Sequence, residues 1–157
     1  MPKITILSRS AFKKFIDSNG INDNTVDSIT NLYLISINTT YGNDSEPFFK
    51  LPHNNVLTLF FDDCDEDCDF IDLSDQNKVI KVKAMSEQQA LTVFNFTKTI
   101  NNDSNVVVHC TLGQSRSGAI GAFINDYFGQ RWEDLKRNNP QIKPNTHIAS
   151  ILRKFLF

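Results

Sequence analysis

The sequence is poor in cysteine, glycine and proline, and it contains no long apolar run. Three Cys, six Gly and five Pro occur among 157 residues. A small, odd number of cysteines does not form a disulfide framework. No apolar stretch approaches the roughly 18 to 20 residues that cross a bilayer, and residues 1–10 lack the basic start and apolar stretch of a signal peptide. We therefore expect a cytoplasmic protein that does not interact with membranes.

Dense basic stripes with interleaved aromatic residues are also missing, so nucleic acid is not an expected partner. The formal net charge is −2, yet six of the 18 acidic residues lie between positions 62 and 69. Without that cluster the chain would be mildly basic. Such a charge balance is compatible with a small anionic substrate.

A globular composition is what the sequence does have. Forty per cent of the residues are hydrophobic, and thirteen are Phe. The length suits one ordinary domain and is too short for two of the usual size. We expect residues 1–157 to form a single domain, and nothing in the sequence predicts its oligomeric state.

The hydrophobic pattern alternates between strand and helix signals. Strands are expected over residues 3–8, 32–37, 56–61 and 106–108. Helices are expected over residues 10–16, from Ser86 with a capping box to Gln89, from Ser117, over residues 131–137, and after a cap at Asn145. The fully apolar run 106–108 is typical of a central buried strand. The pattern predicts an α/β fold.

Residues 109–118, with the sequence His-Cys-Thr-Leu-Gly-Gln-Ser-Arg-Ser-Gly, lie between that buried strand and the next helix. A loop in this position can direct backbone N–H groups and the positive end of a helix dipole at an anion. Gly113 permits a tight turn, and Gly118 lets the helix pack closely. The segment is therefore a candidate phosphate-binding loop.

Cys110 is the candidate nucleophile of this loop, because amides, a helix dipole and a guanidinium all favour a thiolate. Arg116 can hold two phosphoryl oxygens in a bidentate fork, which Lys cannot do. Ser117 can donate its hydroxyl to the cysteine sulfur, and His109 would orient the loop from beneath. The remaining phosphate-binding candidates are Thr111, Leu112, Gly113, Gln114 and Ser115.

The pattern His-Cys-x5-Arg-Ser, in the form His-Cys-x-x-Gly-x-Ser-Arg-Ser, resembles the active-site loop of the protein tyrosine and dual-specificity phosphatases. Within that superfamily it looks closest to the small single-domain group of bacteria and phages. Phe61-Asp62-Asp63, the helix from Ser86 and the pair Pro144-Asn145 stand where this group has corresponding features. The resemblance implies a four- or five-stranded, mostly parallel sheet flanked by helices. It also implies a phosphocysteine intermediate and no cofactor.

In the family, an aspartate from a separate loop protonates the leaving group and then activates water. The third position of Phe-x-Asp makes Asp63 the preferred acid, with Asp62 second and Asp65 third. The implied substrate is a phosphorylated protein or peptide, with phosphotyrosine as the default. The phosphate-binding loop carries no lysine, which argues against phosphoinositides.

Other interpretations of the same residues remain open. An RNA 5′-phosphatase would use the same chemistry, a phosphate-recognition module would bind without turnover, and a rhodanese-like sulfurtransferase also has a reactive Cys on a loop after a strand. Calcium binding by the acidic cluster fails, because Cys68 occupies the glycine position of an EF-hand. Zinc would need His53, Cys64 and Cys68 with no evident fourth ligand, so no metal site is expected.

Overall fold

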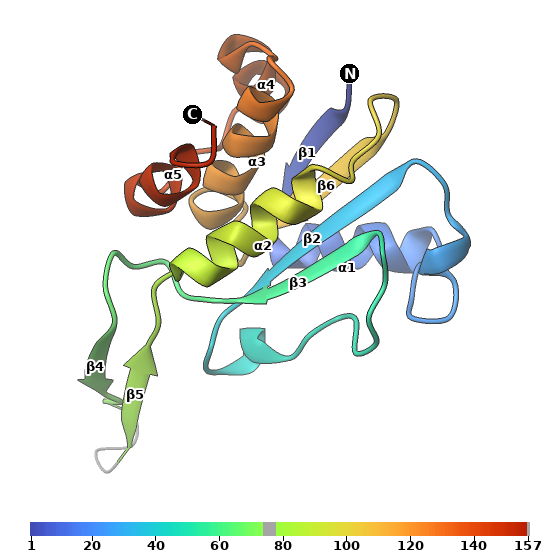
Figure 1. The fold of residues 1–157 in the computed structure, drawn as a ribbon. Coiled ribbons are helices and arrows are strands. Elements are labelled where there is room, and N and C mark those ends of the chain that lie inside the picture. Colours follow the sequence, from blue (N-terminus) through green and yellow to red (C-terminus); the bar gives the residue numbers. More distant parts are fainter. Residues whose placement is uncertain (74–77, 157) are drawn as a thin grey trace.

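A four-stranded parallel sheet forms the centre of the molecule (Figure 1). The computed structural model describes residues 1–73 and 78–156. Across the sheet the strands are β1 (Lys3–Leu7), β6 (Asn105–His109), β2 (Leu32–Asn38) and β3 (Val56–Phe60). Each neighbouring pair is parallel, so all four carboxyl ends lie on the same side of the molecule. The four expected strands are confirmed to within one residue at each end.

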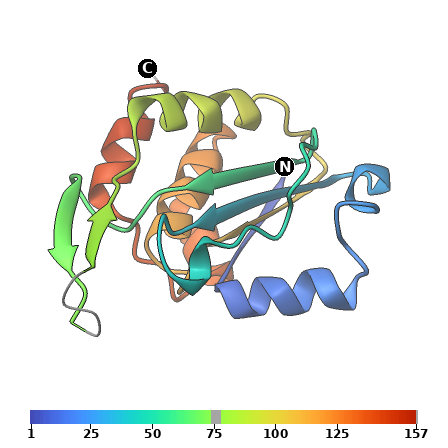
Figure 2. The same cartoon turned by 90° about the horizontal axis from the view of Figure 1, so that it is seen from below.

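Helices cover both faces of this sheet (Figure 2). On one face lies α1 (Arg9–Ser18), and on the other lie α2 (Glu87–Thr97), α3 (Arg116–Tyr127) and α5 (Thr146–Arg153), with α4 (Trp132–Asn138) packed beside α3. Short 3₁₀ turns occur at Val26–Ser28 and Asn43–Ser45. The capping box of Ser86 and Gln89 and the cap at Asn145 are both formed as the sequence predicts. The expected helices are therefore confirmed.

The core has two parts because the sheet is buried on both faces. Side chains alternate across each strand, so Ile35 packs with α2, α3 and α5, whereas Leu34 packs with α1. In β6, Val106 and Val108 belong to the first cluster and Val107 to the second. This double burial explains the continuous apolar run that marks β6 in the sequence.

A second, two-stranded ribbon projects from the carboxyl-end side of the sheet (Figure 1). Its antiparallel strands are β4 (Cys68–Ile71) and β5 (Val79–Val82). We call it the hairpin. The sequence pattern does not predict it, because the acidic cluster directly before β4 obscures that strand and leaves only the β-branched run of β5 as a signal.

No helix among residues 1–73 and 78–156 is both long and apolar enough to cross a membrane.

Candidate active site

The segment between β6 and α3, residues 110–116, forms a loop at the carboxyl end of the sheet, and we call it the Cys110 loop. Cys110 itself is 2% exposed. Gly113 adopts φ +70°, and a Cβ placed there would lie 2.5 Å from the backbone N of Ser8. The loop therefore rests directly on the backbone at the end of β1. Only glycine fits both the left-handed conformation and this close approach.

Three carbonyl groups of the Cys110 loop point away from its centre. They accept hydrogen bonds from backbone amides outside the loop over 3.0–3.1 Å: Thr111 from Arg9, Gln114 from Lys143, and Ser115 from Asn145. In a planar trans peptide, the following N–H lies on the opposite side of the bond from the carbonyl. The amides of residues 112, 115 and 116 consequently face inward. Such converging N–H groups form an anion-binding concavity.

Two polar side chains at the start of α3, those of Arg116 and Ser117, lie beside this concavity. Ser117 Oγ lies 3.0 Å from Cys110 Sγ, close enough to donate a hydrogen bond to a thiolate. Arg116 is 5% exposed; its Nη1 donates to the carbonyl oxygen of Phe61 over 2.9 Å and its Nη2 to Thr111 Oγ1 over 3.0 Å. These bonds fix the plane of the guanidinium and leave further N–H groups for an oxyanion.

His109 lies beneath the loop and is fully buried. Its Nδ1 lies 3.3 Å from the carbonyl oxygen of Cys110 and its Nε2 lies 2.6 Å from Ser36 Oγ. A carbonyl can only accept, so the Nδ1–H tautomer satisfies both contacts, with Ser36 donating to Nε2. Burial lowers the pKa of His109 to about 4, with smaller contributions from the positive charges of Arg9 and Arg116. The ring is therefore a neutral support.

The two neighbouring aspartates after β3 have different surroundings. Asp63 is exposed, and its Oδ1 accepts from Ser115 Oγ and from Asn145 Nδ2, each over 2.8 Å. Both bonds reach one oxygen, which leaves Oδ2 to carry a proton. Asp62 is only 3% exposed, and both of its oxygens accept hydrogen bonds from the protein. Of the two, only Asp63 has an oxygen available for proton transfer.

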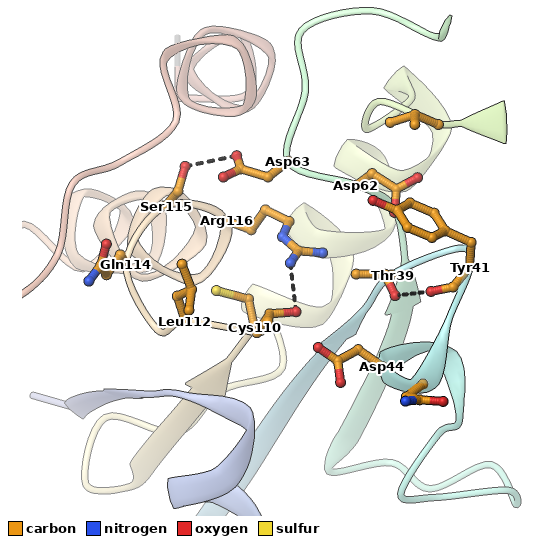
Figure 3. A pocket seen from close by; sticks show the side chains of 13 residues that line it. Thr39, Tyr41, Asp44, Asp62, Asp63, Cys110, Leu112, Gln114, Ser115 and Arg116 are labelled. Atoms are coloured by element: carbon orange, nitrogen blue, oxygen red, sulfur yellow. Dashed lines mark hydrogen bonds between the residues drawn. The ribbon is translucent and has the colours of Figure 1, made fainter. Parts of the chain in front are cut away.

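A cavity of about 570 Å³ opens above Cys110 and Arg116 (Figure 3). The Cys110 loop forms one wall, and residues that follow β2 form the opposite one. The expected residues Asp62 and Asp63 line it, whereas Asp65 does not. The lining consists of Thr39, Tyr41, Asn43, Asp44, Asp62, Asp63, Val82, Cys110, Thr111, Leu112, Gln114, Ser115 and Arg116. Its size suits a side chain or other small organic group.

The opposite wall is the part of the pocket that the sequence does not predict. Tyr41 and Asp44 come from the long segment between β2 and β3, and Val82 comes from the hairpin. No motif marks these residues. Their position near Cys110 is a product of the tertiary structure alone.

The groups considered for zinc do not come together. His53 precedes β3, whereas Cys64 follows it, so they lie toward opposite ends of that strand. Burial, followed by the negative charge of Asp62, raises the pKa of Cys64 to about 11, which keeps it a neutral thiol. Within the described part of the chain, no group of three His, Cys, Asp or Glu side chains is placed to hold a metal ion.

The sequence and the structure were compared with those of known proteins, and the structural comparison identifies the fold. No protein-family model matches the sequence, and no curated protein does either. Among solved structures, the crystal structure of human tyrosine phosphatase-like serine/threonine/tyrosine-interacting protein aligns with a TM-score of 0.55 at 17% identity, covering 99% of this chain and 92% of that chain. The crystal structure of PTPMT1 in complex with PI(5)P gives 0.49 at 10% identity, with 98% and 89% covered. The first likeness confirms the expected cysteine-phosphatase fold.

Proposed function

We propose that this protein is a cysteine-dependent phosphomonoester hydrolase that acts through a phosphocysteine intermediate. The observation that carries the proposal is the Cys110 loop, three of whose carbonyls turn outward, while Cys110 and the buried Arg116 line the cavity above it. Inward amides and a guanidinium are what a phosphoryl group requires as its charge redistributes in the transition state. Residues 1–157 act as one phosphatase domain.

In the first step, the Cys110 thiolate attacks phosphorus and the bond from phosphorus to the leaving oxygen breaks. The inward amides and Arg116 hold the three non-bridging oxygens. Asp63 gives its proton to the leaving oxygen, which departs as an alcohol or phenol. The hydrogen bonds from Ser115 and Asn145 keep the Asp63 carboxyl above the loop for this transfer.

In the second step, water attacks the phosphocysteine and Asp63 takes up a proton from that water. The sulfur–phosphorus bond breaks, and inorganic phosphate and the thiolate are released. Ser117, 3.0 Å from the sulfur, donates a hydrogen bond that stabilises the departing thiolate. No metal or cofactor is required by this sequence of steps.

The substrate class that we assign is a phosphorylated protein or peptide, with phosphotyrosine preferred. The pocket lining supports a substrate with one phosphate group, because Arg116 is the single cationic side chain among the described residues that line it. Membership of the small bacterial and phage group, and a cytoplasmic location, stay predictions from the sequence.

The decisive experiment is hydrolysis of para-nitrophenyl phosphate across pH, with and without a chelator. The variants are Cys110→Ser, Asp63→Asn and Asp62→Asn. We expect chelator-insensitive turnover that Cys110→Ser abolishes. A general acid must be protonated to act, so Asp63→Asn should flatten the fall in kcat at high pH, whereas Asp62→Asn should retain it.

Two outcomes would contradict the proposal. A folded protein that binds phosphate without any turnover would be a recognition module. Turnover of RNA 5′-phosphates in preference to phosphopeptides, with the salt dependence of nucleic-acid binding, would assign the chemistry to RNA instead.

A further inference from the structure

The two edge strands of the parallel sheet, β1 and β3, differ in how their outer backbone groups are satisfied (Figure 1). An edge strand has one neighbour, so every second residue directs its N–H and C=O away from the sheet. In β1, Asn139 accepts from the Ile6 N–H over 2.8 Å and donates to the Ile4 carbonyl over 3.0 Å. Gln141 Nε2 donates to the Ile6 carbonyl over 3.0 Å. Side chains therefore cover the β1 edge.

The hydrogen bonds between β2 and β3 show which groups of β3 point outward. At one end of the ladder, the Leu34 N–H donates to the carbonyl of Asn55 over 2.8 Å. At the other end, the Phe61 N–H donates to the carbonyl of Asn38 over 3.1 Å. The odd-numbered residues between positions 55 and 61 consequently face β2, because the pattern alternates along a parallel strand. The even-numbered residues of β3 direct their backbone groups away from the sheet.

Those even-numbered residues are Val56, Thr58 and Phe60, and each has one outward N–H and one outward C=O. The Val56 N–H donates to the His53 carbonyl over 3.4 Å, and the Phe60 carbonyl accepts from Gln89 Nε2 over 2.8 Å. Within residues 1–73 and 78–156, the Val56 carbonyl, the Phe60 N–H and both groups of Thr58 have no hydrogen-bond partner. Such a row of unpaired groups is a template for another strand.

These unpaired groups match one another across a two-fold axis at Thr58. In an antiparallel pair of two β3 strands, the two copies of Thr58 exchange both of their hydrogen bonds. Each Phe60 N–H then reaches the Val56 carbonyl of the other copy. The groups left over, the Val56 N–H and the Phe60 carbonyl, already have partners within their own chain. Self-pairing therefore satisfies every outward group of β3.

A groove of about 500 Å³ lies beside this edge, between β3 and the segment that precedes it. Its lining consists of Glu46, Pro47, Phe49, Lys50, Leu51, Pro52, Val56, Thr58 and Phe60. The Phe60 side chain is 41% exposed, and that of Leu51 is 57% exposed. In the antiparallel pair, Phe60 of one copy lies opposite Val56 of the other, on the face that the groove occupies. The ring of each copy can therefore bury apolar area in the groove of the other.

Charge favours a second copy of this chain as the occupant. β3 contains neither a charged residue nor a proline, the features with which edge strands usually prevent pairing. The two charged residues that line the groove, Glu46 and Lys50, form an ion pair over 3.2 Å. Two identical surfaces of this kind can meet without repulsion between like charges.

We propose that two copies of this protein associate through the β3 edge, with antiparallel β3 strands paired about a two-fold axis at Thr58. The contact joins the two four-stranded sheets into one continuous sheet. It borders the segment that begins with Phe61 and carries Asp63. The inference is independent of the proposed function, because it requires no chemistry at Cys110.

The test combines analytical ultracentrifugation of the whole chain with hydrogen exchange at single amides, between about 20 and 500 µM. We expect a monomer–dimer equilibrium in which the dimer fraction rises with concentration. The amides of Thr58 and Phe60 should exchange at least about tenfold more slowly in the dimer, because they gain hydrogen bonds there. The amide of Val56 should change less, since it is already bonded. This measurement uses the unaltered protein.

Substitutions in the two edge strands sharpen the test. Thr58→Lys places like charges opposite each other at the two-fold axis, and Phe60→Ala removes the ring that enters the groove. Each should weaken the dimer at least about tenfold. Thr5→Lys is the matched control, because it makes the same change in β1, whose outward groups are covered. It should leave the dissociation constant within about twofold of the wild-type value.

A protein that stays monomeric at the highest concentration would overturn the proposal. A dimer in which the Thr58 and Phe60 amides exchange as fast as in the monomer would also overturn it, because the contact would then lie on another surface. The same conclusion would follow if the dimer persisted in folded Thr58→Lys and Phe60→Ala proteins. If Thr58→Lys fails to fold, Phe60→Ala and the exchange rates of the wild type decide the question.

Discussion

Two histidines near opposite ends of the parallel sheet show how differently the molecule treats the same side chain. His109, at the carboxyl end of β6, packs against the rings of Phe12 and Phe48 at centroid distances of 4.2 and 5.4 Å. Its ring nitrogens contact a hydroxyl and a carbonyl oxygen. Burial keeps it neutral, with a pKa of about 4. A neutral ring has one fixed donor, so it can hold the Cys110 carbonyl without placing charge under the loop.

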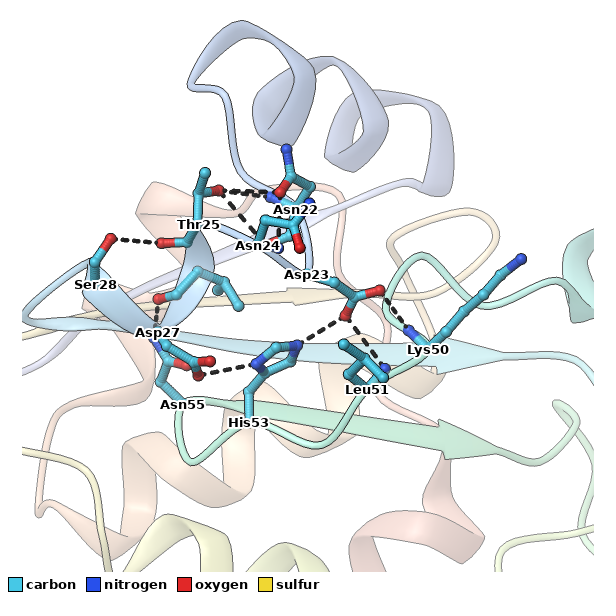
Figure 4. A network of polar contacts seen from close by, with 11 residues as sticks. Asn22, Asp23, Asn24, Thr25, Asp27, Ser28, Lys50, Leu51, His53 and Asn55 are labelled. Carbon is cyan, nitrogen blue, oxygen red and sulfur yellow. Dashed lines mark hydrogen bonds and ion pairs between the residues drawn. The ribbon is translucent and has the colours of Figure 1, made fainter.

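His53, before β3, is held between two carboxylates (Figure 4). Its Nε2 and Nδ1 each lie 2.8 Å from an aspartate oxygen, of Asp23 and Asp27 respectively. The hydrogen bond to Asp23 is the largest cause that raises the pKa of His53, and the same contact lowers the pKa of Asp23. Asp23 also accepts from the backbone N of Lys50 and Leu51. This network fastens the long 39–55 segment to the chain before β2.

Under the proposed function, chemistry takes place at one end of the sheet, while the contacts of His53 stabilise the other end. At the carboxyl end, the charged groups face an open pocket. At the amino end, Asp23 and Asp27 hold the His53 side chain, which is 2% exposed. Three sets of measurements, on turnover, on stability and on its pH dependence, would break or sharpen this distinction.

The largest effect is expected on turnover. Cys110→Ser should lower kcat for para-nitrophenyl phosphate at least about 10⁴-fold, because the nucleophile is lost. Arg116→Lys should lower it about 10²- to 10³-fold, since one ammonium cannot replace the bidentate fork. His53→Gln should change it by less than about twofold, because the site is remote. A large loss of kcat in a folded His53→Gln protein would contradict the division between the two ends.

A smaller effect, on stability, is expected at the glycines. Gly113→Ala should lower the free energy of unfolding by more than about 2 kcal/mol, for two reasons. The added Cβ would clash with the backbone of Leu7 and Ser8, and alanine would be strained in the left-handed conformation. Gly129 has a similar φ of +68°, but a Cβ added there would meet no atom within 4 Å, so Gly129→Ala should cost about 1 kcal/mol from strain alone. Urea unfolding of both variants measures the difference. Equal losses would show that the Cys110 loop can move away from β1.

The smallest effect concerns how stability depends on pH. In the unfolded chain, His109 binds a proton below its ordinary pKa of about 6.5. In the folded protein it does so only below about pH 4. His109 therefore makes stability fall as pH decreases through this window. His53 has the opposite sign: its raised pKa gives stability that is complete below about pH 6.5 and is lost as pH rises through the folded value.

The two contributions can be separated by substitution. His109→Asn should move the pH of maximum stability downward, and His53→Gln should move it upward. Thermal unfolding of the wild type and both variants between about pH 4 and 9 measures this shift. Movement of both maxima in the same direction would contradict the opposite directions of the two pKa shifts.

Much of the fold could be predicted because its signals are local. The apolar run of β6, the capping box at Ser86 and the Asn145 cap each depend on residues a few positions apart. The hairpin could not, because β4 is four residues long, follows directly on the acidic cluster and is exposed along its length. Its contacts with the rest of the protein include the buried Val82 of β5 and the aromatic contact of Phe70 with Tyr41. Its strands gain stability from a partner that the local sequence does not specify.

The adjacent residues Asp62 and Asp63 show that local sequence also cannot predict the roles of side chains within the site. Asp62 and Asp63 are identical in type and consecutive in sequence, so composition and spacing could rank them only by resemblance to a motif. Their difference comes from partners about 20 to 80 positions away: Thr40 and Lys83 occupy both oxygens of Asp62, while Ser115 and Asn145 bind a single oxygen of Asp63.

By itself, the sequence determined the α/β order of elements and the Cys110 loop, because strand and helix periods and the spacing of Cys110, Gly113 and Arg116 are properties of neighbouring residues. The tertiary structure alone decided which aspartate has a free oxygen, in which direction the pKa of each of these two histidines is shifted, and which side chains face Cys110 across the pocket. Those properties depend on burial and on contacts between distant segments, which arise only when the chain is folded.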